Sequence, residues 1–61
     1  MFGLNKTVNS IFHTYNRLYP GKADVIMDAI SNAQARAEKT GMSEEETLDL
    51  IESEIIDRVD P

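Results

Sequence analysis

Two turn signals divide this chain of 61 residues into three segments, and each segment has its apolar residues at helical spacing. Proline disfavours helical geometry in the residue before it and glycine turns freely, so Pro20-Gly21 ends the first segment. Gly41 ends the second segment, and Ser43 precedes the third. Because both connections are short, the pattern predicts an all-α fold, a compact three-helix unit arranged up-down-up. We expect the helices at about residues 4–18, 23–40 and 44–59.

Apolar residues recur every three or four positions in all three segments, as they do in amphipathic helices that bury one face. In the first segment the apolar stripe is Leu4, Val8, Ile11, Phe12, Tyr15, Leu18 and Tyr19. In the second segment it is Val25, Ile26, Ala29, Ile30, Ala33 and Ala37, whose alanines allow a neighbouring helix to approach closely. In the third segment it is Leu48, Ile51, Ile55 and Val59, with Ile56 on the flank.

The clearest local signal is the start of the third segment. Ser43 stands three positions before Glu46, which is the spacing of a capping box. Glu44, Glu45 and Glu46 fill the first turn, where negative charge is favoured by the helix dipole. Just before it, Gly41 is predicted to take the left-handed conformation that terminates the second helix.

Charge is distributed unevenly along the chain. The first 23 residues contain no Asp or Glu and carry a net charge of +3, whereas residues 24–61 hold all eleven acids against three bases, a net of −8. Such asymmetry gives a small molecule two electrostatic faces, which favours packing on itself or on a charged partner.

The length allows one domain, covering residues 1–61. A chain this short buries only about 60 % of the surface that its unfolded form exposes, so its own core gives marginal stability. It has no cysteine and one histidine, which excludes disulfides and the usual Cys/His zinc sites. We therefore expect that homodimerisation, or an apolar face lent to a partner, completes the fold.

Several functional classes are disfavoured by the composition. A net charge of −5 argues against nucleic-acid binding, which depends on Lys and Arg. A helix-turn-helix role is disfavoured because residues 44–57 hold seven acids and no base. No apolar run approaches the ~20 residues of a membrane-spanning helix. The lack of cysteine fits a cytoplasmic protein.

No pattern typical of an enzyme is present. The three glycines are scattered, so they form no phosphate-binding loop, and neither a nucleophile elbow nor a nucleophilic cysteine exists. His13 lies on the polar face of the first helix without an acid nearby in sequence. Glu45, Asp49 and Glu52 share a helix face and could hold a divalent cation, but a solvated acidic face or a basic protein partner fits them better. We expect no catalytic residue, no cofactor and no metal.

The candidate interface combines acids with apolar residues outside the predicted core. Met27 and Leu50 fall away from the apolar stripes of their helices, and Ile56 lies on a flank. The predicted partner-binding residues are Glu45, Asp49, Leu50, Glu52, Ile56 and Met27. They suggest a small acidic, non-enzymatic protein-binding module, an inhibitor or adaptor that regulates a larger protein, whose basic surface the acids would attract.

Two alternatives remain open. In the first, the protein is a self-associating structural protein, in which the basic first helix of one chain meets the acidic third helix of another. In the second, residues 1–19 attach to a membrane surface, with Phe2, Leu4 and Phe12 entering the interface. The first alternative predicts that helicity and stability depend on protein concentration and salt.

One short stretch is similar to a known group of proteins. Leu50-Ile51-Glu52-Ser53-Glu54-Ile55 resembles part of the small bacterial helical-hairpin inhibitors of sporulation kinases, over six residues of an amphipathic pattern. In size and charge, the chain also looks like small acidic proteins of bacteria and phages that bind and inhibit a larger protein. Both resemblances imply a protein partner.

Overall fold

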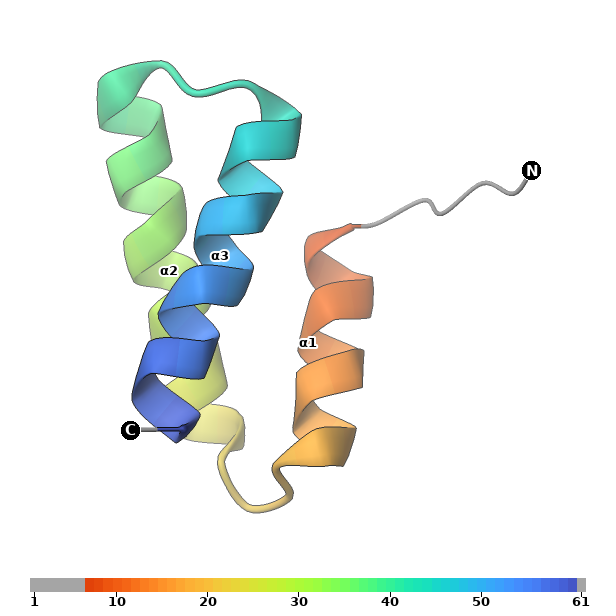
Figure 1. Cartoon of the computed structure of the whole chain (residues 1–61). Helices are drawn as coiled ribbons and strands as arrows, with labels where there is room; N and C mark the ends of the chain where they lie inside the picture. Colours follow the sequence, from red (N-terminus) through yellow and green to blue (C-terminus); the bar gives the residue numbers. More distant parts are fainter. Residues whose placement is uncertain (1–6, 61) are drawn as a thin grey trace, which may run out of the picture.

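The protein is an up-down-up arrangement of helices, as the sequence predicts (Figure 1). The structure is a computed structural model that describes residues 7–60. Within them it contains α1 (Val8–Leu18), α2 (Ala23–Thr40) and α3 (Glu44–Val59), and no strand. α2 and α3 form a hairpin, and α1 lies beside it, roughly parallel to α3 (Figure 1).

α1 begins at Val8, because Thr7 caps it. Thr7 has extended backbone (φ −131°, ψ 164°), and its hydroxyl accepts a hydrogen bond from the Ser10 N–H at 3.1 Å. The Ser10 hydroxyl accepts from the Thr7 N–H at 3.0 Å, which completes a capping box. The helix therefore starts later than the expected position near Leu4, and Leu4 itself lies outside the described residues.

The ends of α2 and the start of α3 follow the predicted chemistry. Gly41 adopts the left-handed conformation (φ 70°), and the Met42 N–H donates to the Ala37 carbonyl at 3.0 Å. Ser43 and Glu46 form the predicted capping box, with reciprocal bonds of 3.2 and 3.3 Å. These bonds satisfy backbone groups that a helix end otherwise leaves unpaired. The connection between α2 and α3 is thus set by local sequence.

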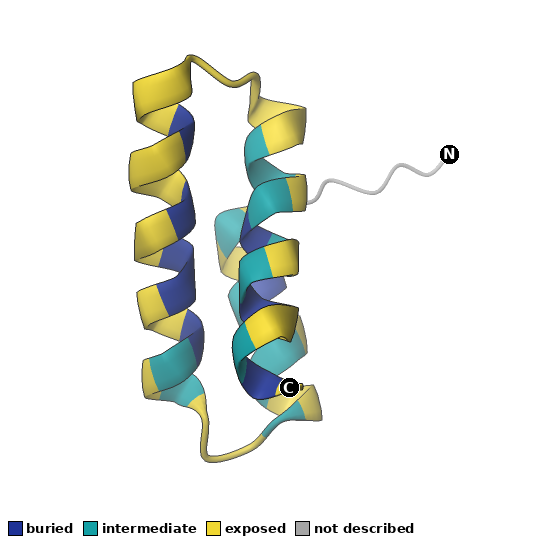
Figure 2. Ribbon diagram, turned by 60° about the vertical axis from the view of Figure 1, so that its left-hand side comes forward, coloured by how far each residue is buried: buried dark blue, intermediate teal, exposed yellow. Residues whose placement is uncertain are grey.

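The core lies mainly between α2 and α3. Ile26, Ile51 and Ile55 are fully buried, and burial of each such side chain contributes about 1.5–3 kcal/mol. Ala29 and Ala33 are also fully buried, which is consistent with the close approach that small residues allow. Figure 2 shows the buried positions of α2 and α3 on the facing sides of the two helices.

α1 contributes less to the core than the sequence suggests. Ile11 is its one buried residue, at 3 % exposure, while Phe12, Tyr15 and Tyr19 are half-buried against the hairpin. Leu18, expected in the core, is 63 % exposed. The core-facing positions at this end of α1 are taken by Tyr15 and Tyr19, whose rings stack with centroids 6.4 Å apart. At about 100° per residue, Leu18 lies within about 20° of the buried Ile11, so its exposure comes from its place as the last residue of α1 rather than from its angle.

Candidate functional site

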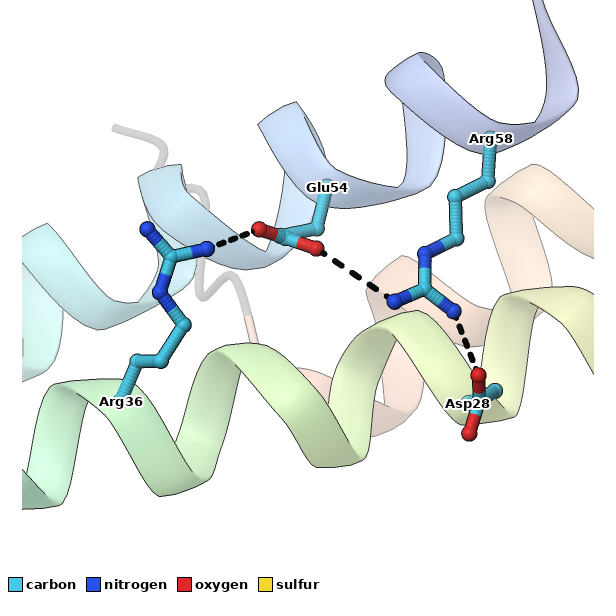
Figure 3. Close-up of polar contacts among 4 residues, drawn as sticks. All are labelled: Asp28, Arg36, Glu54 and Arg58. Carbon is cyan, nitrogen blue, oxygen red and sulfur yellow. Dashed lines mark hydrogen bonds and ion pairs between the residues drawn. The ribbon is translucent and has the colours of Figure 1, made fainter.

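An ion-pair cluster joins α2 to α3 on the face of the hairpin that points away from α1 (Figure 3). The Glu54 carboxylate accepts a hydrogen bond from Arg36 Nη1, and its other oxygen lies 3.8 Å from Arg58 Nη2. Arg58 Nη1 also donates to Asp28 Oδ2 on α2. Glu54 thus lies between two guanidinium groups.

The ion pairs of this cluster connect α2 and α3 and contribute modestly to stability. The Glu54 side chain is 17 % exposed, whereas Arg36 and Asp28 are 63 % and 69 % exposed, so water screens both outer pairs. Surface ion pairs of this kind contribute about 0–1 kcal/mol each. The cluster engages Arg36 and Arg58, so Lys39 is the remaining cation between residues 23 and 59. Between residues 23 and 59 the sequence holds ten acids and three bases.

Four of the predicted partner-binding residues form one surface, which we call the acidic stripe: Glu45, Asp49, Glu52 and Ile56. Their spacing places them within an arc of about 60° along α3, at about 100° per residue. Glu52 lines a hollow of about 220 Å³ together with α1 residues. Those α1 residues are Ser10, Ile11, Thr14 and Tyr15. The acidic stripe therefore runs along the border between α3 and α1.

Two acids of the acidic stripe have no ion-pair partner within residues 7–60. Glu45 and Asp49 are exposed, and neither makes an ion pair with any described residue. The α1 side chains that line the hollow with Glu52 carry no positive charge, since they are hydroxyls, an aliphatic group and a phenol. Ile56 adds an apolar side chain at the end of the stripe, 41 % exposed. Exposed carboxylates such as those of Glu45 and Asp49 attract cationic groups.

Met27 lies apart from this surface. It is 58 % exposed and lines a groove of about 440 Å³ between α1 and α2. We call it the Met27 groove, and it is lined by Val8, Asn9, Phe12, Met27, Ile30, Ser31 and Gln34. The α1 residues in this groove lie on a different flank of α1 from those beside Glu52. α1 therefore lies between Met27 and Ile56, so these two predicted partner-binding residues are on different surfaces of the molecule.

Leu50, predicted as an exposed anchor, packs against the core and is half-buried. It stands one helical turn before Glu54, the residue that meets Arg36 of α2. Leu50 therefore lies on the side of α3 that faces α2, away from the acidic stripe. Leu50 is therefore less exposed than expected, because a helical wheel of α3 alone cannot show where α2 lies. A role for Leu50 in binding a partner stays a prediction.

Sequence reasoning missed one exposed apolar residue beside the acidic stripe. Thr14 and Glu52 line the same hollow, and Leu18 and Ile56 each follow one of them by four residues. Since α1 and α3 run in parallel, Leu18 and Ile56 continue this border toward the same end of the bundle (Figure 1). The sequence did hold one indication that Leu18 would be exposed: it stands at the end of the predicted helix, two turns after Ile11.

No further chemistry is evident in residues 7–60. No three or more His, Asp or Glu side chains there are arranged to hold a metal ion, so geometry does not support the metal interpretation of Glu45, Asp49 and Glu52. No helix in this part of the chain combines the length and hydropathy needed to cross a bilayer. Phe12 packs against the core, and Phe2 and Leu4 lie outside the described residues.

Comparison with known proteins identifies no relative of this chain. The chain gives no significant match to a protein-family model, to a curated protein or to a solved structure. The resemblance of residues 50–55 to the kinase inhibitors thus gains no support, and any functional conclusion depends on the surface of this molecule.

Proposed function

We propose that this chain is a small, non-enzymatic protein-binding module, an inhibitor or adaptor, that binds a basic surface of a larger protein through its acidic stripe. The observation that supports the proposal is the alignment of Glu45, Asp49, Glu52 and Ile56 on one flank of α3, where Glu45 and Asp49 are exposed and make no ion pair within residues 7–60. A cytoplasmic setting, compatible with the lack of cysteine, belongs to the same proposal.

The charge of the stripe determines the class of partner. Exposed carboxylates attract Lys and Arg over a distance of about 10 Å at moderate salt, and this attraction accelerates association. Binding is therefore fast at low salt and slows as salt is added. A neutral or acidic partner would gain nothing from Glu45 and Asp49.

A second copy of the chain is a poor occupant of this stripe. In a two-fold dimer whose axis passes through the stripe, residues of the stripe on one copy would lie against the same residues of the other copy. Carboxylates of one copy would then lie against carboxylates of the other, which costs free energy. The acidic stripe is accordingly assigned to a different, basic protein.

An apolar anchor gives the interface its affinity. Interfaces usually draw most of their binding energy from a few apolar or aromatic residues, while rim charges mainly set rate and specificity. Ile56 and Leu18, exposed at the same end of the α1–α3 border, are the candidates for this role. We assign Leu18 the anchoring role that the sequence suggested for Leu50, because Leu50 is partly buried against the core.

Capture of the partner from a lysate of the source organism tests the proposal when wild type and matched variants are compared. The double variant Glu45→Lys and Asp49→Lys reverses the charge of the stripe. The control, Glu38→Lys and Asp57→Lys, changes the net charge equally at exposed positions outside the stripe. Circular dichroism must show the same helicity in both.

The expected result is a basic protein that wild type and control capture at low salt and that the stripe variant loses. Truncation Ile56→Ala should weaken its capture by at least about tenfold, which corresponds to about 1.4 kcal/mol. The proposal fails if the stripe variant and the control capture the same proteins equally well.

A further inference from the structure

The Met27 groove has no charged residue in its lining, unlike the hollow beside Glu52. The chain as a whole is 28 % charged and carries a net charge of −5. The exposed Met27 and the half-buried Phe12 give this uncharged groove an apolar floor and edge. Methionine side chains adapt readily to the shape of an opposing surface. The groove is therefore a place where two copies of an acidic chain can approach without repulsion.

We propose that the Met27 groove is the interface of a homodimer, in which a second copy of this chain packs its own Met27 groove against the first. A two-fold interface must be compatible with itself, because each residue faces the same patch of the partner. An uncharged apolar patch meets this requirement, whereas the acidic stripe does not. The short chain also has little core of its own, so covering Met27 and Phe12 adds to its stability.

The borders of the groove support one arrangement of the two copies. On the α1 side, Arg17 stands two turns beyond Asn9, and on the α2 side, Asp24 stands one turn before Met27. Both residues are exposed and lie near the turn that joins the helices. A two-fold axis parallel to the helices lays α1 of one copy over α2 of the other. Arg17 of each copy then approaches Asp24 of its partner, an attractive pairing.

This interface is independent of the proposed partner site. The Met27 groove and the acidic stripe border opposite flanks of α1, so a dimer leaves both acidic stripes open. A dimer would thus present two copies of the stripe to a partner, which raises the avidity for a partner with repeated basic surfaces.

Sedimentation equilibrium of the whole chain tests the dimer with a matched pair of variants. Met27→Asp places a carboxylate inside the groove, and Ile56→Asp makes the same change on the other side of α1. We expect wild type and Ile56→Asp to dimerise with similar dissociation constants. For Met27→Asp we expect a dissociation constant at least about tenfold higher, because buried carboxylates would face each other across the interface.

Cross-linking gives a second readout that does not depend on a charged substitution. The chain has no cysteine, so Met27→Cys or Ile56→Cys introduces a single thiol. With a short bifunctional maleimide, Cys at 27 should give covalent dimer at least about tenfold faster than Cys at 56, owing to the high effective concentration within a dimer.

Either of two results overturns the proposal. One is a wild-type chain that stays monomeric at millimolar concentration and cross-links equally slowly from both positions. The other is a full chain that dimerises only after residues 1–6 are deleted, since that segment would then occupy the groove in place of a second copy.

Discussion

Arg36 on α2 donates a hydrogen bond to Glu54 on α3, a residue 18 positions further along the chain. Glu54 also faces Arg58 on its own helix, at 3.8 Å. This arrangement links α2 to α3 on the side of the hairpin away from α1 and engages two of its cations. Glu45 and Asp49 lie on another side of α3, are exposed and make no ion pair within residues 7–60.

Neutralising Glu54 should destabilise the hairpin modestly. We expect Glu54→Gln to lower the free energy of unfolding by about 1 kcal/mol, since it weakens two largely solvent-screened pairs. Glu38→Gln, at an exposed position without an ion pair in residues 7–60, should change stability by less than about 0.5 kcal/mol. Urea unfolding at low and high salt measures both, and the effect of Glu54→Gln should shrink as salt rises. An effect that grows with salt would contradict the ionic interpretation.

Two adjacent isoleucines should respond very differently to truncation. Ile55 is fully buried and Ile56 is 41 % exposed. Ile55→Ala should cost about 2–5 kcal/mol, a large share of the about 3–9 kcal/mol expected for a domain of this length. Ile56→Ala should cost less than about 1 kcal/mol. Thermal unfolding followed by circular dichroism gives both values, and similar losses for the two variants would mean that α3 is rotated from the orientation described.

The capping box of α3 should contribute measurably to stability. Ser43→Ala removes the acceptor for the Glu46 N–H, and loss of such a cap typically costs about 1 kcal/mol. Ser53→Ala, at an exposed position inside the same helix, should be neutral or slightly stabilising, because alanine is the better helix former. Chemical denaturation distinguishes the two. Equal effects would show that the cap does not determine where α3 begins.

α1 should open more readily than the hairpin. It buries one residue, Ile11, whereas α2 and α3 bury most of the core. Regions with few buried apolar contacts open locally at lower free energy, and their amide protons exchange sooner. Hydrogen exchange followed by NMR should therefore show faster exchange at Ile11 and Tyr15 than at Ile30 and Ile55. Equal protection in all three helices would indicate that the bundle opens only as a whole.

Sequence patterns predicted the elements well, because their causes are local. The boundaries of α2 and α3 follow from Gly41, Ser43 and Glu46, which act on neighbouring backbone groups. The stripe of Ile26, Ala29 and Ala33 faces the core because the helix period alone groups those positions. The Thr7–Ser10 capping box was less visible, since serine is less typical than glutamate at the third position.

The site was predicted less well, because it depends on how the helices are rotated against each other. Leu50 appears exposed on a helical wheel, yet the face of α3 that carries it packs toward α2. Leu18 fits the core pattern of α1, yet Tyr15 and Tyr19 occupy the contact at that end. The pairing of Asp28 with Arg58 spans 30 positions and needs the fold to be known. Glu45, Asp49, Glu52 and Ile56 share one helix, so their spacing alone placed them together.

The most direct test of the central claim is partner binding measured for Ile56→Asp and Met27→Asp side by side. Both variants add one negative charge at an exposed apolar residue, but on opposite sides of α1. We expect Ile56→Asp to lose the basic partner and Met27→Asp to retain it. Loss of the partner in Met27→Asp with retention in Ile56→Asp would place the binding surface on the Met27 groove and contradict the role of the acidic stripe.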